Sequence, residues 1–393
     1  MSVTITLNGE KVYIESDIFE SLFRNSIVSN RVDVRNALAG KLLPFKTFLS
    51  LTYDADIPYP LFFASKDVVN EQIKLKTDKL MAGFTKATFS MHSRNLVQLS
   101  DVELIVKDLL RKQELFKKYD SNLTSNSVVG ILRKSRGTVT EDVRRLMDAL
   151  NITWNDLRMA KSREVALEYL IGRLEAKQIM VARGVRSYMP QEIPSHAKFS
   201  GMTIKDNKVP FIFLANGNEN DNLEPTGRRL FTLVLLTVLT ARGTFAPVTY
   251  NGHTTDSASP REYELTAEIL MPAREFNQFK LDDIEALKNA AERFKVTPSA
   301  VAMRAWRLNR MDRSSFERCM DILANEYNNR GKVYNRSPNP INSLRRYNGT
   351  EFSRRMLEFL DEKRISHSEF RRIVFLNKIP LDMLNDFRKA VHD

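Results

Sequence analysis

The strongest pattern in the chain is a continuous apolar run near its middle. Residues 227–243, GRRLFTLVLLTVLTARG, have almost no polar face, and they end in a basic turn followed by a glycine. A helix that is apolar on all sides belongs in the interior of a protein, and the closing Arg242-Gly243 is typical of a helix C-terminus. The apolar part spans about a dozen residues, which is too short to cross a bilayer. The pattern therefore predicts one buried central helix.

Shorter runs predict strands in two parts of the chain. Residues 3–14 alternate between apolar and polar positions on either side of Asn8-Gly9, which is a hairpin signature. Three further apolar runs precede the central helix, at residues 179–182, 199–204 and 209–214. We expect a hairpin near the N-terminus and a small sheet beside the central helix.

Helical spacing accounts for most of the remaining chain. In residues 138–150, Val143, Leu146 and Leu150 line one face of a predicted helix. Similar spacing occurs at residues 17–25, 32–39, 99–119, 162–177, 265–270, 290–304, 351–363 and 366–376. The predicted fold class is therefore α+β and mostly helical. The predicted domains are a small N-terminal unit (1–75), a helical linker domain (76–155), a domain with the sheet and the central helix (156–310) and a helical C-terminal module (311–393).

The composition of the chain indicates the kind of partner and the cellular compartment to expect. The 393 residues include 60 Lys or Arg against 48 Asp or Glu, which gives a net charge of +12 and a pI near 9.6. Such a balance favours an anionic partner, most often nucleic acid. The only cysteine, Cys319, excludes an internal disulfide framework and suits a reducing cytoplasm. No secretory signal or membrane-length apolar run is visible, so we expect a cytoplasmic protein without a membrane contact.

Two motifs around the central helix point to a family. Phe231-Thr232-Leu233 lies near the start of this helix, and residues 267–272, AEILMP, follow it downstream. In this order they resemble the ImmA/IrrE family of zinc metallopeptidase-like proteins, in which Phe-Thr-Leu precedes H-E-x-x-H on a helix and Ala-Glu-Leu-Leu-Met-Pro comes later. The resemblance is most specific over residues 160–311 and weakest in the first 40. It implies a zincin-like peptidase domain at residues 156–310.

The resemblance places the family's metal site on residues that cannot bind zinc. The positions of H-E-x-x-H fall on Leu235, Leu236 and Leu239, and the family's third ligand, an acid, corresponds to Arg261, with Glu262 one register away. Zinc needs nitrogen, sulfur or oxygen ligands, and the peptidase also needs a glutamate as its general base. We therefore predict a pseudo-metallopeptidase without catalytic activity, without a metal and without a cofactor.

Long members of the family carry an Xre-type helix-turn-helix unit at the N-terminus. Residues 44–51 and 57–63 are similar to the closing phrase of that unit, but the recognition-helix stretch is compressed into residues 29–40. A helix-turn-helix reads DNA with polar side chains in the major groove. The candidates of this kind are Asn30, Arg31, Arg35 and Asn36. The alternative is a degenerate unit that serves packing or the formation of a homodimer.

Residues 290–304 also have the spacing of a helix-turn-helix, with a turn at Lys295-Val296-Thr297. In the family, a similar segment closes the peptidase domain, which favours a structural role. Arginines recur at every third position from Arg304 to Arg313, so they drift around the helix. Arg304 and Arg307 are the candidates for a contact with phosphate.

Three functions are compatible with these patterns. The first is an inactive ImmA/IrrE-like regulator of a mobile element, which binds a protein partner (a repressor or a toxin), DNA, or both, as a transcriptional regulator, antirepressor or antitoxin. The second is an interaction or structural subunit of a phage or phage-defence complex, without DNA binding. The third is a residual enzyme with a different metal site, built from Glu262, Glu264, Glu268, Asp256 or His253.

Overall fold

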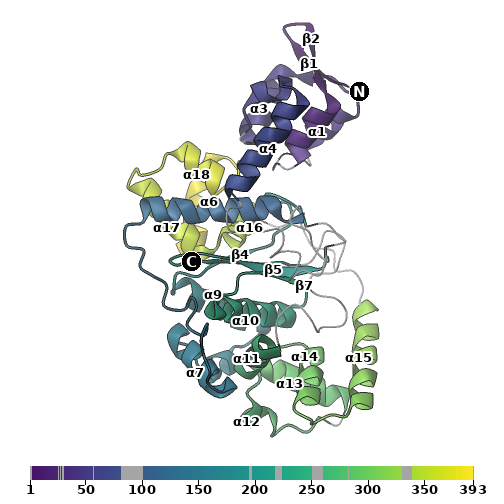
Figure 1. Cartoon of the computed structure of the whole chain (residues 1–393), viewed down its shortest axis with the longest axis vertical. Helices are drawn as coiled ribbons and strands as arrows, with labels where there is room; N and C mark the ends of the chain where they lie inside the picture. The colour runs from purple at the N-terminus through teal and green to yellow at the C-terminus, as the bar shows by residue number, and fades with distance from the viewer. Residues whose placement is uncertain are drawn as a thin grey trace.

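Two small mixed sheets are set in a chain that is otherwise mostly helical, as the sequence predicts. The computed structural model describes residues 2–24, 26, 28, 31–55, 57–80, 101–193, 197–216, 224–249, 260–281, 283–329 and 339–392. Figure 1 shows an N-terminal unit that stands apart from a larger body, which comprises the described residues from 101 onward. Among the described helices, none combines the length and the apolar character that crossing a bilayer requires.

The N-terminal unit is a three-stranded sheet packed against short helices. Its elements are β1 (Ser2–Leu7), β2 (Glu10–Glu15), α1 (Ser16–Arg24), α2 (Val32–Leu38), β3 (Leu43–Pro44), α3 (Phe45–Asp54), the 3-10 helix η1 (Tyr59–Phe63) and α4 (Lys66–Leu80). The strand order is β2-β1-β3, and β1 is antiparallel to β2 and parallel to β3. The hairpin turns through Asn8 and Gly9, with φ angles of 50° and 87°, which is the left-handed backbone that Asn-Gly favours. The predicted hairpin is confirmed.

A cluster of phenylalanine rings gives this unit a core of its own. Phe19, Phe23, Phe48 and Phe62 are buried, and the ring centroid of Phe62 lies 4.7 Å from that of Phe23 and 5.1 Å from that of Phe48. The apolar side chains of β1 and β2 pack against the same cluster, which contains no residue of the body. The N-terminal unit therefore has the separate core that an independent structural unit requires.

The body is built around a four-stranded sheet that is covered on both faces. The strands are β4 (Met180–Arg183), β5 (Phe199–Ile204), β6 (Phe211–Leu214) and β7 (Pro247–Thr249), in the order β4-β6-β5-β7. β4 and β6 are parallel, and β5 is antiparallel to β6 and β7. Successive side chains of a strand point to opposite faces, so Val181 and Ile212 enter one core while Met180 and Phe211 enter the other.

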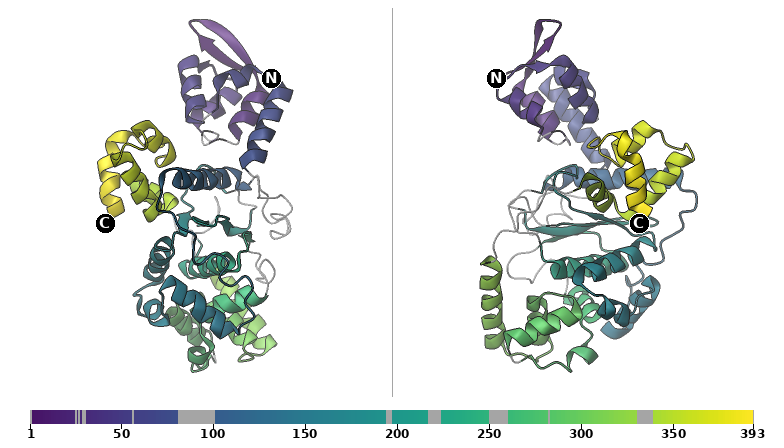
Figure 2. Two further views of the ribbon diagram at one scale, coloured as in Figure 1. Left: turned by 60° about the vertical axis from the view of Figure 1, so that its left-hand side comes forward. Right: turned by 180° about the vertical axis from the view of Figure 1, so that it is seen from behind.

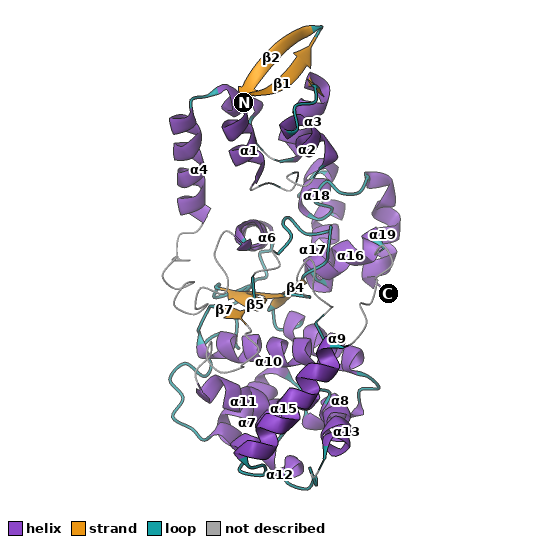
Figure 3. Ribbon diagram, turned by 90° about the vertical axis from the view of Figure 1, so that its right-hand side faces the viewer, coloured by secondary structure: helices purple, strands orange, loops and turns teal. Residues whose placement is uncertain are grey.

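Helices form one layer on each face of this sheet. The layer that faces the N-terminal unit consists of α6 (Glu103–Tyr119), α16 (Pro340–Asn348), α17 (Thr350–Asp361), α18 (His367–Ile373), the 3-10 helix η3 (Leu381–Met383) and α19 (Leu384–His392). Figures 2 and 3 show these helices between the sheet and the N-terminal unit. The rings of Phe116 and Phe352 lie 5.0 Å apart, so α6 and the C-terminal helices share one core.

The opposite layer contains the predicted central helix. Its elements are α7 (Val139–Leu150), α8 (Trp154–Met159), α9 (Arg163–Glu175), α10 (Thr226–Arg242), α11 (Pro260–Leu270), α12 (Ala273–Phe276), α13 (Ile284–Phe294), α14 (Pro298–Arg307) and α15 (Arg313–Asn328). α10 lies directly under the sheet and ends at Gly243, whose φ is 71°. The predicted buried helix over 227–243 is confirmed.

Gly201 shows how closely α10 approaches the sheet. A Cβ atom on this β5 residue would lie 2.8 Å from Cδ1 of Leu236 and 2.5 Å from the carbonyl oxygen of Phe213. Both distances are shorter than van der Waals contact, so a side chain at residue 201 would separate β5 from α10. The central helix and the sheet therefore form one tightly packed block.

Candidate functional site

The positions that the resemblance to the ImmA/IrrE family assigns to zinc ligands lie in the apolar core of the body, around α10. Leu235, Leu236 and Leu239 of α10 are 2%, 0% and 4% exposed. They pack with side chains of the sheet, α9 and α11 in one apolar cluster. Their side chains carry no ligand atom, and the space around them is filled by hydrocarbon. A zinc ion cannot be held at this place by these residues.

Three of the four charged residues of α11 are held by partners from other segments, and the fourth, Glu264, is exposed. Arg261, at the position of the third ligand, donates to Oδ2 of Asp142 at 2.8 Å and to the carbonyl oxygen of Gly137 at 2.6 Å. Glu262 accepts a hydrogen bond from Nε of Arg242 at 3.1 Å. Arg261 therefore ties α11 to α7, and Glu262 ties it to the end of α10.

Glu268 is engaged in the same manner at the other end of α11. It forms an ion pair with Arg304 and accepts the backbone N–H of Ala273 at 3.2 Å. Asp256 and His253, which the residual-enzyme hypothesis includes, lie outside the described residues. Within the described residues, no group of three or more His, Cys, Asp or Glu side chains is arranged to hold a metal ion.

The two arginines predicted to contact nucleic acid on α14 differ in accessibility. Arg304 is 6% exposed, pairs with Glu268 and donates through Nε to the carbonyl oxygen of Met271 at 3.2 Å. Its pKa is lowered by burial, which the nearby carboxylate of Glu268 opposes. The prediction for Arg304 is therefore corrected: it is a buried link between α14 and α11. Arg307 is exposed, with its guanidinium over the ring of Tyr263, and its contact with phosphate stays a prediction.

The polar candidates of the N-terminal unit are arranged around α2. Arg31 precedes this helix and forms an ion pair with Asp54 at 2.6 Å, which links it to the end of α3. Arg35 is exposed and Asn36 is half-buried, and Asn30 lies outside the described residues. Residues 1–75 contain eight Lys or Arg and nine Asp or Glu. The unit thus lacks the excess of basic residues that drives binding to a phosphate backbone.

Exposed apolar side chains are concentrated in the N-terminal unit. Ten of the fourteen large apolar side chains that are exposed in the described part of the chain belong to it: Leu7, Tyr13, Val32, Leu38, Leu42, Tyr53, Tyr59, Phe63, Val68 and Leu75. The other four are Met159, Val165, Trp306 and Ile322, in a body almost four times as long. Within the described part of the chain, the N-terminal unit is therefore the richest in exposed apolar side chains.

The most apolar part of this surface is residues 57–64, IPYPLFFA, which we call the 57–64 segment. It includes η1, and only Phe62 is fully buried in the unit's core. Tyr59 and Phe63 are each 45% exposed, and their rings lie 6.1 Å from Phe45 and 6.3 Å from Phe48. The buried ring fixes the segment, while the two exposed rings remain available for contact.

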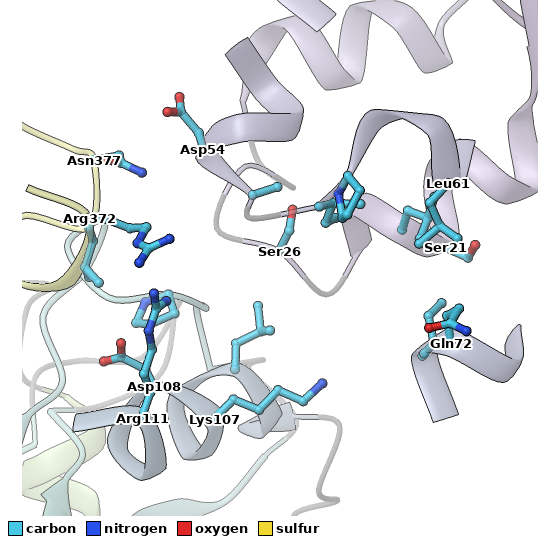
Figure 4. Close-up of a pocket in the computed structure, with 18 of the residues that line it drawn as sticks. Ser21, Ser26, Asp54, Leu61, Gln72, Lys107, Asp108, Arg111, Arg372 and Asn377 are labelled. Atoms are coloured by element: carbon cyan, nitrogen blue, oxygen red, sulfur yellow. The ribbon is translucent and has the colours of Figure 1, made fainter. Parts of the chain in front are cut away.

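A cleft of about 1320 Å³ separates the 57–64 segment from the body. The wall on the side of the N-terminal unit is mostly apolar and contains Ile57, Pro58, Pro60 and Leu61, together with residues of α4 and the polar Ser21, Ser26 and Asp54. The opposite wall combines the polar side chains of Lys107, Asp108 and Arg111 of α6, Arg372 of α18 and Asn377 (Figure 4) with the apolar Leu104, Leu110 and Leu376. A partner that contacts the 57–64 segment would therefore also meet charged groups of the body.

A buried polar network supports the body's wall of this cleft. The ammonium of Lys112, which is fully buried, lies 2.7 Å from Oδ2 of Asp108, and the hydroxyl of Tyr347 donates to the same oxygen at 2.7 Å. Burial lowers the pKa of Lys112, against the effect of Asp108, and burial also raises the pKa of Tyr347. The network fixes Asp108 at the wall and joins α6 to α16.

The same wall contains an unusual backbone turn. Leu376 and Asn377 have consecutive left-handed φ angles of 49° and 55°. Asn377 is 7% exposed, and within the described part of the chain its Nδ2 atom has no hydrogen-bond acceptor. Strained backbone and an unsatisfied amide are both costly, and such features are more frequent at functional sites than elsewhere.

Sequence reasoning missed the cleft and the exposed surface above it. The walls of the cleft come from segments near residues 60, 110 and 375, and no local pattern brings these together. The 57–64 segment gave one usable signal, because two prolines within an apolar run argue against a buried strand. Comparisons of the chain with protein-family models, with curated proteins and with solved structures found no match.

Proposed function

We propose that the chain is a non-catalytic regulatory protein that acts by binding a protein partner through the N-terminal unit. The observation that carries the proposal is the combination of exposed apolar side chains and absent basic excess in residues 1–75. Interfaces between proteins are centred on aromatic and apolar anchors. Tyr59 and Phe63 are exposed side chains of this kind, and Pro58, Pro60 and Leu61 of the same segment line the cleft. A repressor or a toxin of a mobile element is the partner that the family resemblance suggests.

The absence of peptidase activity is the second part of the proposal. Leucines at the three helix positions and an arginine at the third-ligand position leave the predicted metal site without donors. Glu262 and Glu268 are engaged by Arg242 and Arg304, so they serve the packing of α11. The zincin-like body would then act as a scaffold that carries the N-terminal unit.

DNA binding is favoured less by the N-terminal unit than by the body. Residues 101–393 contain 48 Lys or Arg and 38 Asp or Glu, so the positive charge of the chain resides there. Binding that depends on this charge would be of the phosphate type and steeply sensitive to salt. The alternative role, as a subunit of a phage or phage-defence complex, uses the same protein-binding surface and differs in the identity of the partner.

Affinity capture of the tagged full-length protein from its own cells, with and without nuclease, tests the proposal. We expect a stoichiometric protein partner that survives nuclease treatment, because apolar contacts do not depend on nucleic acid. Recovery of partners only in the untreated sample would contradict the proposal and favour a DNA-binding regulator. Metal analysis of the same purified protein tests the second part, and zinc bound in a one-to-one ratio would contradict it.

A further inference from the structure

The first turn of α10 lies at the end of the body's sheet where β4 and β6 finish and β5 begins. Arg183 is the last residue of β4, and β6 ends beside it at Leu214 because the two strands are parallel and in register. Ser200, near the start of β5, hydrogen-bonds to Glu224 just before α10. In sheets of this type, ligands bind beyond the carboxyl ends of parallel strands, where the positive end of a helix favours anions.

Four arginines converge at this edge, and we call Arg183, Arg228, Arg229 and Arg346 the arginine cluster. Burial lowers the pKa of Arg229; Glu224 and Glu164 oppose this effect, while the charges of Arg183 and Arg346 add to it. Like charges near one another are unfavourable unless anionic groups offset them. The residues of the cluster belong to β4, α10 and α16. They therefore come from the sheet and from the helical layers on both of its faces.

Two buried donors of the cluster lack a partner. The Nε atoms of Arg183 and Arg229 are buried, and in the described part of the chain neither has a hydrogen-bond acceptor. Arg183 uses Nη1 for an ion pair with Glu168, and Arg229 uses Nη2 to donate to Oγ1 of Thr226 at 2.8 Å. Buried donors without acceptors cost free energy, and guanidinium groups bind phosphate through several donors at once.

Glu224 supplies a second, independent sign of a binding site. It is 7% exposed; its Oε1 accepts from the Ser200 hydroxyl at 3.4 Å and lies 4.0 Å from Nε of Arg228, and its Oε2 is buried without a partner among the described residues. Burial raises the pKa of Glu224 to about 7, although Arg228 and Arg229 oppose the change. Below that pH the carboxyl is mostly neutral, and its O–H can donate a hydrogen bond to an anion.

Carboxyl groups also lie at this end of the sheet. The acidic groups that face the arginine cluster include Glu164, Glu168, Glu175 and Glu224. Burial raises the pKa of Glu175 and of Glu224 to about 7, so the charge here is positive when these two carboxyl groups are neutral. Glu168 is paired with Arg183, and Glu164 accepts from the hydroxyl of Thr226 at 2.7 Å. Pro225 precedes the first turn of α10, and among the described residues no side chain caps this helix N-terminus. Positive charge, uncapped backbone donors and unsatisfied side chains thus coincide.

We propose that the arginine cluster, Glu224 and the N-terminus of α10 form a binding site for a tetrahedral oxyanion, either phosphate or the phosphate group of a small ligand. The exposed Arg346 of α16 and the buried Nε atoms of Arg183 and Arg229 would supply its donors. The anion would bridge β4, α10 and α16 and stabilise their packing. This site is remote in sequence from the 57–64 segment and does not depend on the proposed partner.

Calorimetric titration of the full-length protein with inorganic phosphate, at constant ionic strength set with chloride, tests the proposal. We expect saturable binding by the wild type and an affinity at least tenfold weaker in Arg346→Gln, which removes an exposed arginine of the site. Arg144→Gln removes an exposed arginine of α7 and should bind phosphate as the wild type does. Absence of saturable binding, or equal affinities in the two variants, would overturn the proposal.

Two further titrations identify the ligand class. Acetate, a planar carboxylate, should bind at least tenfold more weakly than phosphate, and equal binding of the two anions would contradict a tetrahedral site. If adenosine monophosphate competes with inorganic phosphate and binds more tightly, the natural ligand is a small organic molecule with a phosphate group. Competition without tighter binding would assign the site to the free anion.

The pH dependence tests the part assigned to Glu224. With sulfate as the probe, because its charge is constant near neutral pH, affinity should fall as the pH rises from 6 to 8 and the carboxyl ionises. Glu224→Gln keeps an uncharged donor at this position, so its affinity for sulfate should fall less over this range than that of the wild type, and the remaining fall belongs to Glu175, which also interacts with Arg183 and has a pKa of about 7. If the affinity of the wild type for sulfate is constant between pH 6 and 8, Glu224 is not part of the binding site.

Discussion

The N-terminal unit and the body of this protein present opposite kinds of surface. The unit has nearly balanced charge and exposes ten large apolar side chains, whereas the body carries most of the positive charge and exposes four in its described part. Inside, the unit is held by phenylalanine rings, and the body adds arginine–carboxylate pairs between its helices. The excess of basic residues and the exposed apolar side chains thus lie in different parts of the molecule. The net charge of the whole chain therefore describes neither the N-terminal unit nor the body.

The connection between the two parts is slight compared with the packing inside each. The hydroxyl groups of Tyr53 and Ser368 lie 3.3 Å apart and join α3 to the C-terminal helices. The 57–64 segment faces the body across the cleft. A partner that binds in this region is thus able to contact both kinds of surface.

The largest effect is expected from placing the residues of an H-E-x-x-H zinc motif in α10. Leu235→His, Leu236→Glu and Leu239→His together place three polar groups in a core that has no space for them. Each change removes packing worth about 2–5 kcal/mol, so we expect the triple variant not to fold, as circular dichroism would show. A folded triple variant that binds zinc would contradict the account of this region as plain core.

The next effect concerns the buried pair beneath the cleft. Lys112→Met leaves the carboxylate of Asp108 without its ammonium partner, and loss of one member of a buried pair costs about 3–5 kcal/mol. Urea unfolding should show this loss in Lys112→Met. The double variant Lys112→Met with Asp108→Asn should recover part of it, because no buried charge remains. Equal losses in both variants would show that packing alone, and not charge, decides the stability here.

A smaller effect is expected from the pH dependence of the body. Burial raises the pKa of Glu175 to about 7, against its hydrogen bond from the backbone N–H of Glu351. A raised pKa favours the folded state at low pH, and this contribution is lost as the pH rises through 7. We expect Glu175 to contribute about 1 kcal/mol to the fall in unfolding free energy between pH 6 and 8. Glu175→Gln should lack this component, and an unchanged slope would contradict the assignment.

The smallest effect on stability is expected at the surface of the N-terminal unit. Tyr59→Ser with Phe63→Ser removes side chains that are 45% exposed, outside the buried ring cluster. Substitutions at such positions usually change the unfolding free energy by about 0.5 kcal/mol or less. Thermal unfolding of the double variant should therefore resemble that of the wild type. A large loss of stability would show that the two rings belong to the core of the N-terminal unit, and it would contradict their assignment to the proposed interface.

The sequence predicts the elements whose pattern is local. The apolar run over 227–243 becomes α10 (Thr226–Arg242), and the predicted helix at 138–150 becomes α7, where Thr138 caps the N-terminus as part of a capping box. β7 was not predicted, because three residues, Pro247–Thr249, carry no periodicity. The predicted fold class depends only on such local elements, which is why it agrees with the structure.

The sites were less predictable, because they depend on contacts between distant segments. The spacing of arginines along α14 gave no indication that Arg304 is buried against Glu268, since Glu268 lies 36 residues earlier. In the same way, the composition assigned a basic character to the whole chain, although the N-terminal unit has none. Burial and charge pairing follow from tertiary packing, which a single sequence does not show.

We have proposed that the N-terminal unit binds a protein partner through exposed apolar side chains. The most direct test is quantitative partner capture by the wild type, by Tyr59→Ser with Phe63→Ser, and by a matched control in the body, Met159→Ser with Ile322→Ser, which also removes two exposed apolar side chains. We predict that the first variant loses at least nine-tenths of the captured partner, while the control retains it. Equal capture by all three proteins would contradict the claim.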